Sequence, residues 1–469
     1  MLSREVDLVV IGAGTVGENI ADRAVQGGLS VAMVEAELVG GECSYWACMP
    51  SKALLRAGAV SRAARAVQGV GTVGDVDPAG AFARRDRIAH DWDDSSQVDW
   101  ATGAGIDVVR GHGRLAGERR VVVTGSDGVE TELIARHAVA VATGSVSLLP
   151  DIPGLAEISP WTSRDATSAK SAPESLAILG GGVVGSEMAT AYSDFGTHVT
   201  LIARSGLLGG MEPFAGDRVA GALRTRGVDV RTGVEVVAAR TEGTAKVLEL
   251  SDGSEVRAAD VLVAVGRTAR TGDLGLETIG LEPGAWLDVD DTLRVRGYDW
   301  LYAAGDVNHR ALLTHQGKYQ ARAAGDVIAA RAIGEDADDA PWGRHVATAD
   351  HAAVPQVTFT DPEVASVGFT AEAAEKAGHR IRILDYDLSW LAGATVQADD
   401  YAGTARAIVD EDRKVLIGMT LVGAGVGELL HAATIAIVGE VPLDRLWHAV
   451  PAYPTLSEVW LRLLETYGL

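Results

Sequence analysis

The sequence predicts an α/β fold with two doubly wound parallel sheets and a C-terminal α+β layer. Two stretches carry this prediction, because each runs from a short apolar strand through a glycine-rich turn into a helical pattern. A mixture of strand and helix patterns after residue 355 indicates the third layer. At 469 residues the chain is too long for one hydrophobic core, so we expect about three domains.

The first unit begins with an apolar strand at residues 7–11. Gly12, Gly14 and Gly17 follow in the spacing Gly-x-Gly-x-x-Gly and lead into a helical pattern. These glycines permit a tight turn and let a pyrophosphate approach the helix N-terminus. A second strand ends at Glu35, where a carboxylate can accept a hydrogen bond from a ribose hydroxyl. Strand, spacing and acidic residue together predict a dinucleotide site rather than an ordinary glycine turn.

A second unit of the same kind starts with the apolar strand at residues 176–179. Gly180, Gly182 and Gly185 follow this strand and precede a helical pattern, as in the first unit. The same argument about the turn and the helix N-terminus applies here. The chain therefore contains two dinucleotide-type units.

The end of the next strand, at residues 198–202, bears on which pyridine nucleotide binds. NAD sites present a carboxylate at this point for the ribose 2′-hydroxyl, whereas NADP sites need a cation for the 2′-phosphate. Ala203 stands where the carboxylate would be, and Arg204 supplies a guanidinium. We expect NADPH to be preferred, with NADH possible; the alternative is that Arg204 is an ordinary surface arginine.

Both cysteines of the chain lie close together, at Cys43 and Cys48. Five residues of intact helix advance about 7.5 Å, too far for a disulfide, so a bridge requires irregular backbone between the two. Pro50 indicates a helix that starts near Cys48, because proline is well placed in a first helical turn. A helix N-terminus lowers the pKa of a thiol. The spacing predicts a redox-active pair, and the alternative is two buried structural thiols.

The stretch around the pair reads Gly-Gly-Glu-Cys-Ser-Tyr-Trp-Ala-Cys-Met-Pro-Ser-Lys. It resembles the redox loop of the flavoprotein disulfide reductases, the family of dihydrolipoamide dehydrogenase, glutathione reductase and mercuric reductase. The resemblance implies that Cys48 is the charge-transfer thiolate nearer the flavin and that Cys43 exchanges with the substrate. Tyr45, Trp46 and Ala47 depart from the smaller residues usual in the family, so we expect a differently shaped approach to the sulfurs.

The same resemblance implies FAD and NAD(P)H as cofactors, with the first unit binding the ADP half of FAD. Asp306 follows Gly305 at the end of an apolar strand, and in the family this aspartate binds the ribityl chain. A plain β-turn aspartate is the alternative. Further cofactor-binding positions come from the redox loop, an Ala-Thr-Gly strand end and a Gly-Arg turn: Gly41, Thr143, Gly144, Gly266 and Arg267.

Lys52 ends the redox-loop motif, and Glu187 follows the second glycine-rich turn. In the family these two positions pair beside the flavin. A buried pair would keep a positive charge near the isoalloxazine and so stabilise the reduced anionic flavin. We therefore expect Lys52 and Glu187 to be paired. His315, near a helix start that should face the flavin, is interpreted as a structural residue or one that acts through another.

The C-terminus departs from the disulfide-reducing members of the family. Those members end in His-Pro-Thr-x-x-Glu, and their histidine acts as acid and base on the cysteines of the partner subunit. This chain has Tyr453 in place of the histidine and keeps Glu458. A phenol with a pKa near 10 is a poor base at neutral pH, whereas imidazole is well matched. Mercuric reductase and quinone-reducing relatives also lack the histidine, which leaves the acceptor open.

Composition excludes some classes of partner. The formal charge of −23 repels nucleic acid, and two cysteines in so long a chain argue against a secreted disulfide framework. The sequence shows neither an apolar signal core nor an uninterrupted apolar run of about 18 residues. We therefore expect a cytoplasmic protein that binds neither nucleic acid nor membrane.

These observations predict an FAD-dependent NAD(P)H oxidoreductase. Electrons would pass through the flavin to the Cys43–Cys48 pair and on to a small-molecule disulfide. One alternative is direct transfer from the flavin to a quinone or metal ion, with Tyr453 lining an apolar pocket; another is a non-catalytic flavoprotein within a larger assembly. The expected FAD-binding, NAD(P)-binding and homodimer interface domains are residues 1–148 with 271–345, 149–270, and 346–469.

Overall fold

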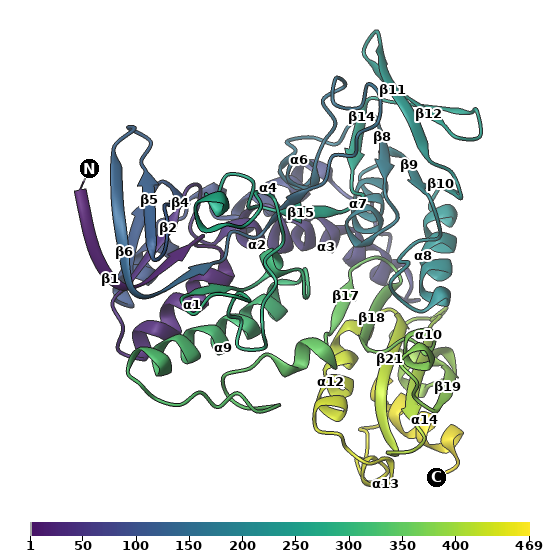
Figure 1. Cartoon of the computed structure of the whole chain (residues 1–469). Helices are drawn as coiled ribbons and strands as arrows, with labels where there is room; N and C mark the ends of the chain where they lie inside the picture. The colour runs from purple at the N-terminus through teal and green to yellow at the C-terminus, as the bar shows by residue number, and fades with distance from the viewer. Residues whose placement is uncertain (1) are drawn as a thin grey trace. The chain divides into compact units, whose positions relative to one another are not determined.

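The computed structural model describes residues 2–469, and Figure 1 labels its helices and strands. The chain forms two compact units. The first contains the residues through Pro50 together with Asp86–Ser147 and Arg267–Asp350. The second contains Ser51–Arg85, Leu148–Gly266 and His351–Leu469. Each unit therefore combines segments that are far apart in the sequence.

The first unit is built on a parallel sheet in the order β3-β2-β1-β6. Strand β16 and the antiparallel strand β5 share the other edge of β6, and β4 pairs with β5. Leu8, Val9 and Val10 in β1 are completely buried, which is typical of a parallel strand covered on both faces. Helices α1 and α9 pack against each other beside this sheet (Figure 1).

The elements of the first unit follow in chain order: β1 (Leu2–Ile11), α1 (Thr15–Gln26), β2 (Val31–Glu35), α2 (Gly41–Tyr45), α5 (Ser95–Gly103), β3 (Asp107–Arg110), β4 (His112–Leu115), β5 (Arg120–Thr124), β6 (Glu130–Val141), β7 (Ser145–Ser147), β15 (Arg267–Ala269), β16 (Leu301–Ala303) and α9 (Thr314–Ala332). Helices α3 (Cys48–Arg65) and α4 (Pro78–Ile88) each have residues in both units. Strands β7 and β15 form a separate antiparallel pair.

The second unit contains a four-stranded parallel sheet in the order β10-β9-β8-β14 and an antiparallel sheet β11-β12-β13. Leu176, Ala177 and Ile178 of β8 are completely buried, as in β1 of the first unit. The elements of this part are α6 (Ser163–Ser168), β8 (Ser175–Leu179), α7 (Val183–Asp194), β9 (His198–Ala203), α8 (Pro213–Thr225), β10 (Asp229–Thr232), β11 (Val236–Glu242), β12 (Ala245–Leu250), β13 (Glu255–Ala258) and β14 (Asp260–Val263).

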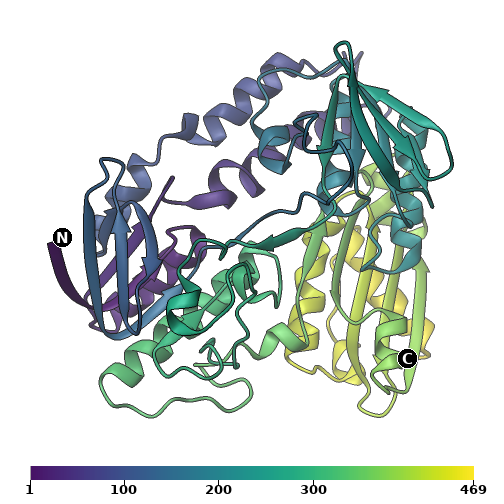
Figure 2. The same cartoon turned by 45° about the horizontal axis from the view of Figure 1, so that its top comes forward.

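The C-terminal part of the second unit is an antiparallel sheet in the order β17-β18-β21-β20-β19. Figure 2 shows this sheet with its helices beside it, and α12 and α14 contact β21 and β19. Its elements are β17 (Gln356–Thr358), β18 (Glu363–Gly368), α10 (Ala371–Lys376), β19 (Ile381–Asp387), α11 (Ala392–Gln397), β20 (Thr404–Asp410), β21 (Val415–Gly423), α12 (Leu430–Val438), α13 (Leu443–Leu446) and α14 (Val459–Tyr467).

The predicted fold, with two doubly wound parallel sheets and a C-terminal α+β layer, is confirmed. The boundaries of three separate domains stay a prediction, because the second nucleotide-type sheet and the C-terminal layer belong to one compact unit. In open parallel sheets, ligands bind beyond the carboxyl ends of the strands. In the first unit this edge carries Gly12 after β1, Glu35 at the end of β2 and Thr143 after β6. Among the described residues, no helix is both long enough and apolar enough to cross a membrane.

Candidate functional site

The two cysteines lie on either side of a break between two helices. Cys43 is in α2, which ends at Tyr45, and Cys48 is the first residue of α3. Trp46 has φ −135° and ψ −9°, so the helical path is interrupted between the cysteines. The two residues are thiols in this structure, and their side chains are hydrogen-bonded to each other. The irregular backbone that a Cys43–Cys48 bridge requires is therefore present.

The surroundings of Cys43 and Cys48 favour a state in which the two sulfurs share one proton. The hydrogen bond to Cys48, and then burial, raise the pKa of the Cys43 thiol far above its usual range. Two sulfurs in contact resist carrying two negative charges, so the pair holds one proton after the first is lost. Sγ of Cys48 also lies 3.2 Å from Oγ1 of Thr314, the first residue of α9. The sequence indicated a helix start here but not the contact with Cys48; His315, the next residue, is exposed.

The first glycine-rich turn is shaped by close packing at two of its three glycines. Gly12 has φ +100°, and a Cβ there would lie 2.5 Å from the carbonyl oxygen of Ala142. A Cβ on Gly17 would overlap the carbonyl oxygen of Gly12. Gly14, in contrast, has only an ordinary contact with Gly41 and begins α1 without a side-chain cap. The amide groups at the start of α1 thus fit an anionic group such as a pyrophosphate.

Gly41 of the redox loop packs directly on this turn. It has φ +60°, and a Cβ there would lie 2.7 Å from the Cα of Gly14. Gly305 approaches the same helix, because a Cβ on it would lie 2.9 Å from Cγ2 of Val16 in α1. The structure therefore brings together three segments that the sequence marked separately as cofactor-binding.

Two polar side chains at the edge of the first sheet fit a ribose and a phosphate-bearing ligand. Oε2 of Glu35 accepts from the backbone N–H of Ala13 at 2.8 Å, and Oε1 accepts from that of Glu37 at 2.7 Å. Burial raises the pKa of this carboxyl. Oγ1 of Thr143 is buried and has no hydrogen-bond partner among the described residues, and Gly144 leaves open space beside it. A buried hydroxyl without a partner indicates a place where a ligand can bind.

Asp306 is held by a short polar relay. Ser145 donates its hydroxyl to Asp306 and accepts from Nε of Arg267 at 2.6 Å. Nη2 of Arg267 also donates to the carbonyl oxygen of Ser145 at 2.8 Å, and burial raises the pKa of Asp306. The sequence placed Arg267 at the close of the second nucleotide unit, directly after Gly266; in the structure it belongs to the first unit with Asp306. Ser145 was missed, and its position after Gly144 was the only signal.

The second glycine-rich turn repeats the geometry of the first. Gly180 has φ +115°, and a Cβ on Gly185 would overlap its carbonyl oxygen. Gly182 has open space and begins α7 without a side-chain cap. Arg204 follows β9 and is 85% exposed, with its Nε 3.8 Å from Oε1 of Glu235. The guanidinium group of Arg204 is therefore exposed after the end of β9, with Glu235 as its neighbour.

Lys52 and Glu187 meet in the second unit. Nζ of Lys52 lies 2.8 Å from Oε2 of Glu187, whose side chain is only 4% exposed. Oε1 of Glu187 accepts from the backbone N–H of Phe359 at 2.9 Å, and the Phe359 ring lies 4.9 Å from Nζ of Lys52. Phe359 was not predicted from the sequence. The ammonium group is thus held between a carboxylate and an aromatic ring.

A second ion pair joins the same two helices. Arg62 of α3 contacts Asp194 of α7 and also Asp361, which lies two residues after Phe359. Arg226 completes the group with a 2.7 Å contact to Asp361. The Lys52–Glu187 and Arg62–Asp194 ion pairs thus join α3 to α7 at two places along the helices. The position of Lys52 is therefore well defined by its surroundings.

Among the described residues, no hydrogen bond joins Tyr453 to Glu458. Tyr453 is 75% exposed, and among residues 2–469 it has no hydrogen-bond partner. Glu458 is buried and pairs instead with Arg462, one helical turn later, at 2.5 Å. Its other oxygen, Oε2, is buried without a partner in the described part of the chain. Arg462 was missed, although its spacing of four residues from Glu458 was a signal for a helical ion pair.

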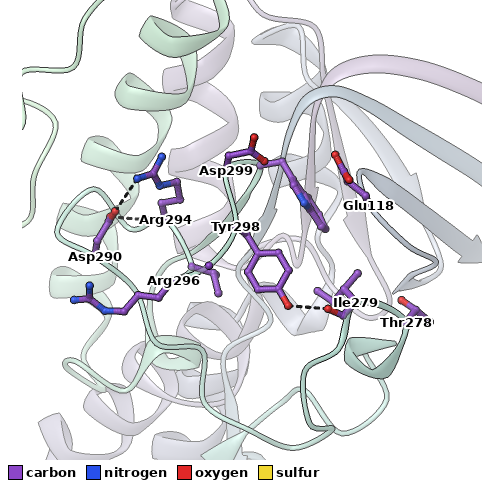
Figure 3. A pocket seen from close by; sticks show the side chains of 11 residues that line it. Glu118, Thr278, Ile279, Asp290, Arg294, Arg296, Tyr298 and Asp299 are labelled. Carbon is purple, nitrogen blue, oxygen red and sulfur yellow. Dashed lines mark hydrogen bonds and ion pairs between the residues drawn. The ribbon is translucent and has the colours of Figure 1, made fainter.

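A pocket of about 910 Å³ lies elsewhere in the first unit and includes none of the predicted site residues (Figure 3). Its charged side chains contact neighbours, as with Arg294 and Asp290 at 3.5 Å. The Tyr298 hydroxyl donates to the carbonyl oxygen of Ile279 at 2.7 Å. The pocket thus contains no thiol, and its charges are largely satisfied within the protein.

Comparison with known proteins identifies the family. The family model described as pyridine nucleotide-disulphide oxidoreductase matches residues 6–325, and the model of its dimerisation domain matches residues 354–463. The chain is 32% identical to a mercuric reductase of Streptomyces lividans, covering 98% of this chain and 96% of that protein. It is 31% identical to a dihydrolipoyl dehydrogenase of Haloferax volcanii, covering 98% of this chain and 95% of that protein.

Solved structures agree in fold. The HOCl-induced flavoprotein disulfide reductase RclA from Escherichia coli, solved as a Cu(II) complex, has a TM-score of 0.83 at 24% identity, covering 98% of this chain and 99% of that chain. LpdA from Mycobacterium tuberculosis also has a TM-score of 0.83, at 22% identity over the full length of both chains. The family models and the two relatives above 30% identity show that the chain belongs to the pyridine nucleotide-disulphide oxidoreductases, a family of FAD-dependent enzymes that use pyridine nucleotides.

Proposed function

We propose that this protein passes electrons from NAD(P)H through FAD to the Cys43–Cys48 pair and on to a disulfide-type acceptor. The observation that carries the proposal is the hydrogen-bonded thiol pair at the break between α2 and α3. A thiol pair in contact can close to a disulfide and reopen, which is the chemistry a dithiol reductant needs. The Lys52–Glu187 pair and the two glycine-rich turns support the same function.

The residues of the first unit fit FAD. The amide groups at the start of α1 would hold its pyrophosphate, Glu35 a ribose, and Asp306 the ribityl chain. Thr143 has an unpartnered buried hydroxyl to offer a polar atom of the cofactor. When bound, FAD would supply the carrier that accepts two electrons from the nicotinamide and delivers them to the pair in its disulfide form, which opens to the two thiols.

The glycine turn gives a prediction that separates folding from cofactor binding. Gly17→Ala is expected to destabilise the protein and abolish FAD retention, because the new Cβ overlaps the Gly12 carbonyl. Gly14→Ala is expected to leave the apoprotein fold intact, since its Cβ has space, yet to weaken FAD binding at least tenfold by blocking the pyrophosphate. Thermal unfolding of the apoproteins and FAD titration measure the two effects. Equal FAD affinity in Gly14→Ala and wild type would show that the pyrophosphate binds elsewhere.

The thiol chemistry balances as an exchange between two disulfides. The Cys43 thiolate attacks one sulfur of the acceptor, forms a mixed disulfide and expels the first product thiolate. Cys48 then attacks Cys43, so that the Cys43–Cys48 disulfide forms and the second product thiolate leaves. The two protons of the dithiol go to the two product thiols. Thr314, 3.2 Å from Cys48, can hydrogen-bond to the sulfur when it is a thiolate.

NADPH is proposed as the preferred nucleotide because Arg204 is exposed at the end of β9. Arg204→Ala is expected to raise the KM for NADPH about 10- to 100-fold and to leave the KM for NADH nearly unchanged, since only NADPH carries the 2′-phosphate. Steady-state kinetics with both nucleotides measure this ratio. Glu235→Gln is the matched control: removing the neighbouring carboxylate should lower the KM for NADPH. A KM that rises equally for both nucleotides would contradict the assignment.

The matched dimerisation domain supports a homodimer as the assembled form.

A metal ion or quinone is the second candidate acceptor, and one observation favours it. Tyr453, an exposed phenol, stands where disulfide-reducing relatives have their base, so the chain offers no imidazole at that position. The 32% identity to a mercuric reductase supports the same alternative.

One experiment decides between the acceptors. The FAD-loaded protein is reduced anaerobically with NADPH and mixed with a low-molecular-weight disulfide or, separately, with a quinone, and flavin reoxidation is followed in wild type and Cys43→Ser. Fast reoxidation by the disulfide that is lost in Cys43→Ser supports the thiol pathway. Equal reoxidation of both proteins by quinone, with none by the disulfide, would overturn it and make the flavin the direct reductant. Cys48→Ser tests whether the second sulfur is also required.

A further inference from the structure

A buried carboxylate anchors the beginning of helix α9. The side chain of Asp350 is only 1% exposed, and both of its oxygens accept hydrogen bonds from this helix. Nε2 of Gln316 donates to Oδ1 at 2.7 Å, and Nε2 of Gln320 donates to Oδ2 at 2.9 Å. Nη1 of Arg310 lies 3.6 Å from the same Oδ2 and supplies the opposite charge. Losing the carboxylate would leave buried amide groups without an acceptor, so these contacts hold the helix firmly.

The orientation of Gln320 is fixed from its other end. Its side chain is completely buried, and Oε1 accepts from the backbone N–H of Gly305 at 2.8 Å and from Nδ2 of Asn308 at 2.8 Å. Two donors on the oxygen leave the amide nitrogen to face Asp350. The carboxylate is thus connected through one side chain to the residue that precedes Asp306.

The same two turns of α9 contact Cys48 from a different face. Gln316 and Gln320 are four residues apart and so lie on one face of the helix. Thr314, two residues before Gln316, is turned about 200° around the helix axis from it. There its Oγ1 lies 3.2 Å from Sγ of Cys48. The helix is therefore held on one face by Asp350 and presents the Thr314 hydroxyl on another.

We propose that Asp350 is a positioning residue for the thiol pair, which holds the first turns of α9 so that the Thr314 hydroxyl stays within hydrogen-bond distance of Cys48. The inference rests on the proposed function, since it names a residue that controls the reactivity of one of the same two sulfurs. A hydroxyl held at this distance donates to a thiolate and stabilises it. Asp350 itself touches neither sulfur and acts through Gln316, Gln320 and Thr314.

Removing Asp350 has opposite expected effects under positioning and under a direct effect of its charge. A carboxylate disfavours a nearby thiolate, so its removal would make Cys48 more reactive if charge alone acted. Loss of the anchor instead lets the Thr314 hydroxyl move away from the sulfur, so that less of Cys48 is thiolate and the residue reacts more slowly. The direction of the change therefore separates the two explanations.

The test measures alkylation of Cys48 by iodoacetamide as a function of pH. The FAD-loaded protein carries Cys43→Ser, so that Cys48 is the only thiol of the chain. At about pH 7, Asp350→Leu and Thr314→Val are each expected to slow alkylation about three- to tenfold, the effect of losing one hydrogen bond to the thiolate. At about pH 10 the rates should agree within about twofold, because the thiol is then largely ionised in every variant.

Further variants separate positioning from loosened packing. In Asp350→Leu/Thr314→Val the two losses should not multiply, because both act through the same hydroxyl. Asp350→Asn is the conservative variant: its oxygen can accept from Gln320, and Gln316 can turn its amide to accept from the new Nδ2. This variant should therefore react at least as fast as the parent protein.

A matched control removes a different partner of Arg310. Asp291 is half exposed and accepts from Nη2 of Arg310 at 2.9 Å. Asp291→Asn removes this charge and leaves the contacts of Asp350 with α9, so the alkylation profile should stay unchanged. Should Asp350→Leu fail to fold, Gln316→Leu, which removes one of the two amide contacts, should slow alkylation about two- to threefold at about pH 7.

Three results would overturn the proposal: a rate at about pH 7 that is unchanged or faster in Asp350→Leu, or in Gln316→Leu where that variant replaces it; losses that multiply in the double variant; and a loss of the same size at about pH 10. Alkylation needs no electron acceptor, so this measurement is independent of the reoxidation experiment. If the flavin reduces quinone directly while Asp350→Leu still slows alkylation of Cys48, the proposed function fails and the positioning role stands.

Discussion

Replacing Tyr453 by histidine is expected to raise the rate of disulfide reduction by about 10²- to 10⁴-fold. A phenol with a pKa near 10 neither accepts nor donates a proton efficiently at neutral pH, whereas imidazole titrates near pH 6.5. The new side chain would occupy an exposed position, since Tyr453 is 75% exposed, so the substitution should not disturb the core. Oε2 of Glu458 is buried without a partner in the described chain and is available to orient a ring nitrogen.

The measurement is the reoxidation rate of NADPH-reduced protein by a small disulfide, recorded against pH. The histidine variant should show a new inflection near pH 6.5, the unperturbed pKa of imidazole. Tyr453→Phe is the matched control: it removes the hydroxyl without adding a base, and the disulfide rate should stay at the wild-type value. A Tyr453→His variant that is no faster than wild type would mean that acid–base help at residue 453 does not limit the exchange. Arg462 forms an ion pair with Oε1 of Glu458 and so competes for this carboxylate. The rate of disulfide reduction should therefore rise further in the double variant Tyr453→His/Arg462→Met.

Replacing Glu187 by leucine is expected to lower the free energy of unfolding by about 2–4 kcal/mol. The carboxylate is only 4% exposed and satisfies both the Lys52 ammonium and the Phe359 N–H. Leucine leaves both donors without their acceptor. Because Lys52 is 35% exposed, water partly compensates, and the loss should fall below that of a fully buried pair.

Glu187→Gln separates the two contributions. Its carbonyl oxygen can still accept from Phe359, while the charge opposite Lys52 is lost, so the expected cost is about 1–2 kcal/mol. Urea unfolding followed by flavin fluorescence and by circular dichroism measures both variants. Equal stability of the leucine variant and wild type would show that the pair contributes no net stability.

The sequence was sufficient for the parts of the site that are local. Each glycine-rich turn is defined within about twenty residues, and the same is true of the cysteine pair and of the helix that begins at Cys48. In these cases backbone conformation follows from residues that are neighbours in the chain.

The contacts that were missed join distant segments. Thr314 is 266 residues from Cys48, and the N–H of Phe359 is 172 residues from Glu187. No short-range pattern encodes such a pairing, because it depends on how the sheets and helices pack. Arg267 is a further example. The Gly-Arg motif can be read from the sequence, but its hydrogen-bond partner, Ser145, lies 122 residues away in the chain. The Glu458–Arg462 pair is different, since its spacing was visible and only its importance was overlooked.

The position of β16 has a consequence for how the protein is made. This strand, residues 301–303, pairs in parallel with β6, which was completed at residue 141. A ribosome that has synthesised the first nucleotide-type sheet must therefore add more than a hundred further residues before the sheet gains its last parallel strand. During that interval residues 139–141 of β6, which lie beyond its pairing with β5, have an unpaired edge, and such edges invite pairing with other chains. The nascent chain thus depends on early burial of the β6 edge, and conditions that slow translation after residue 141 should favour aggregation over maturation.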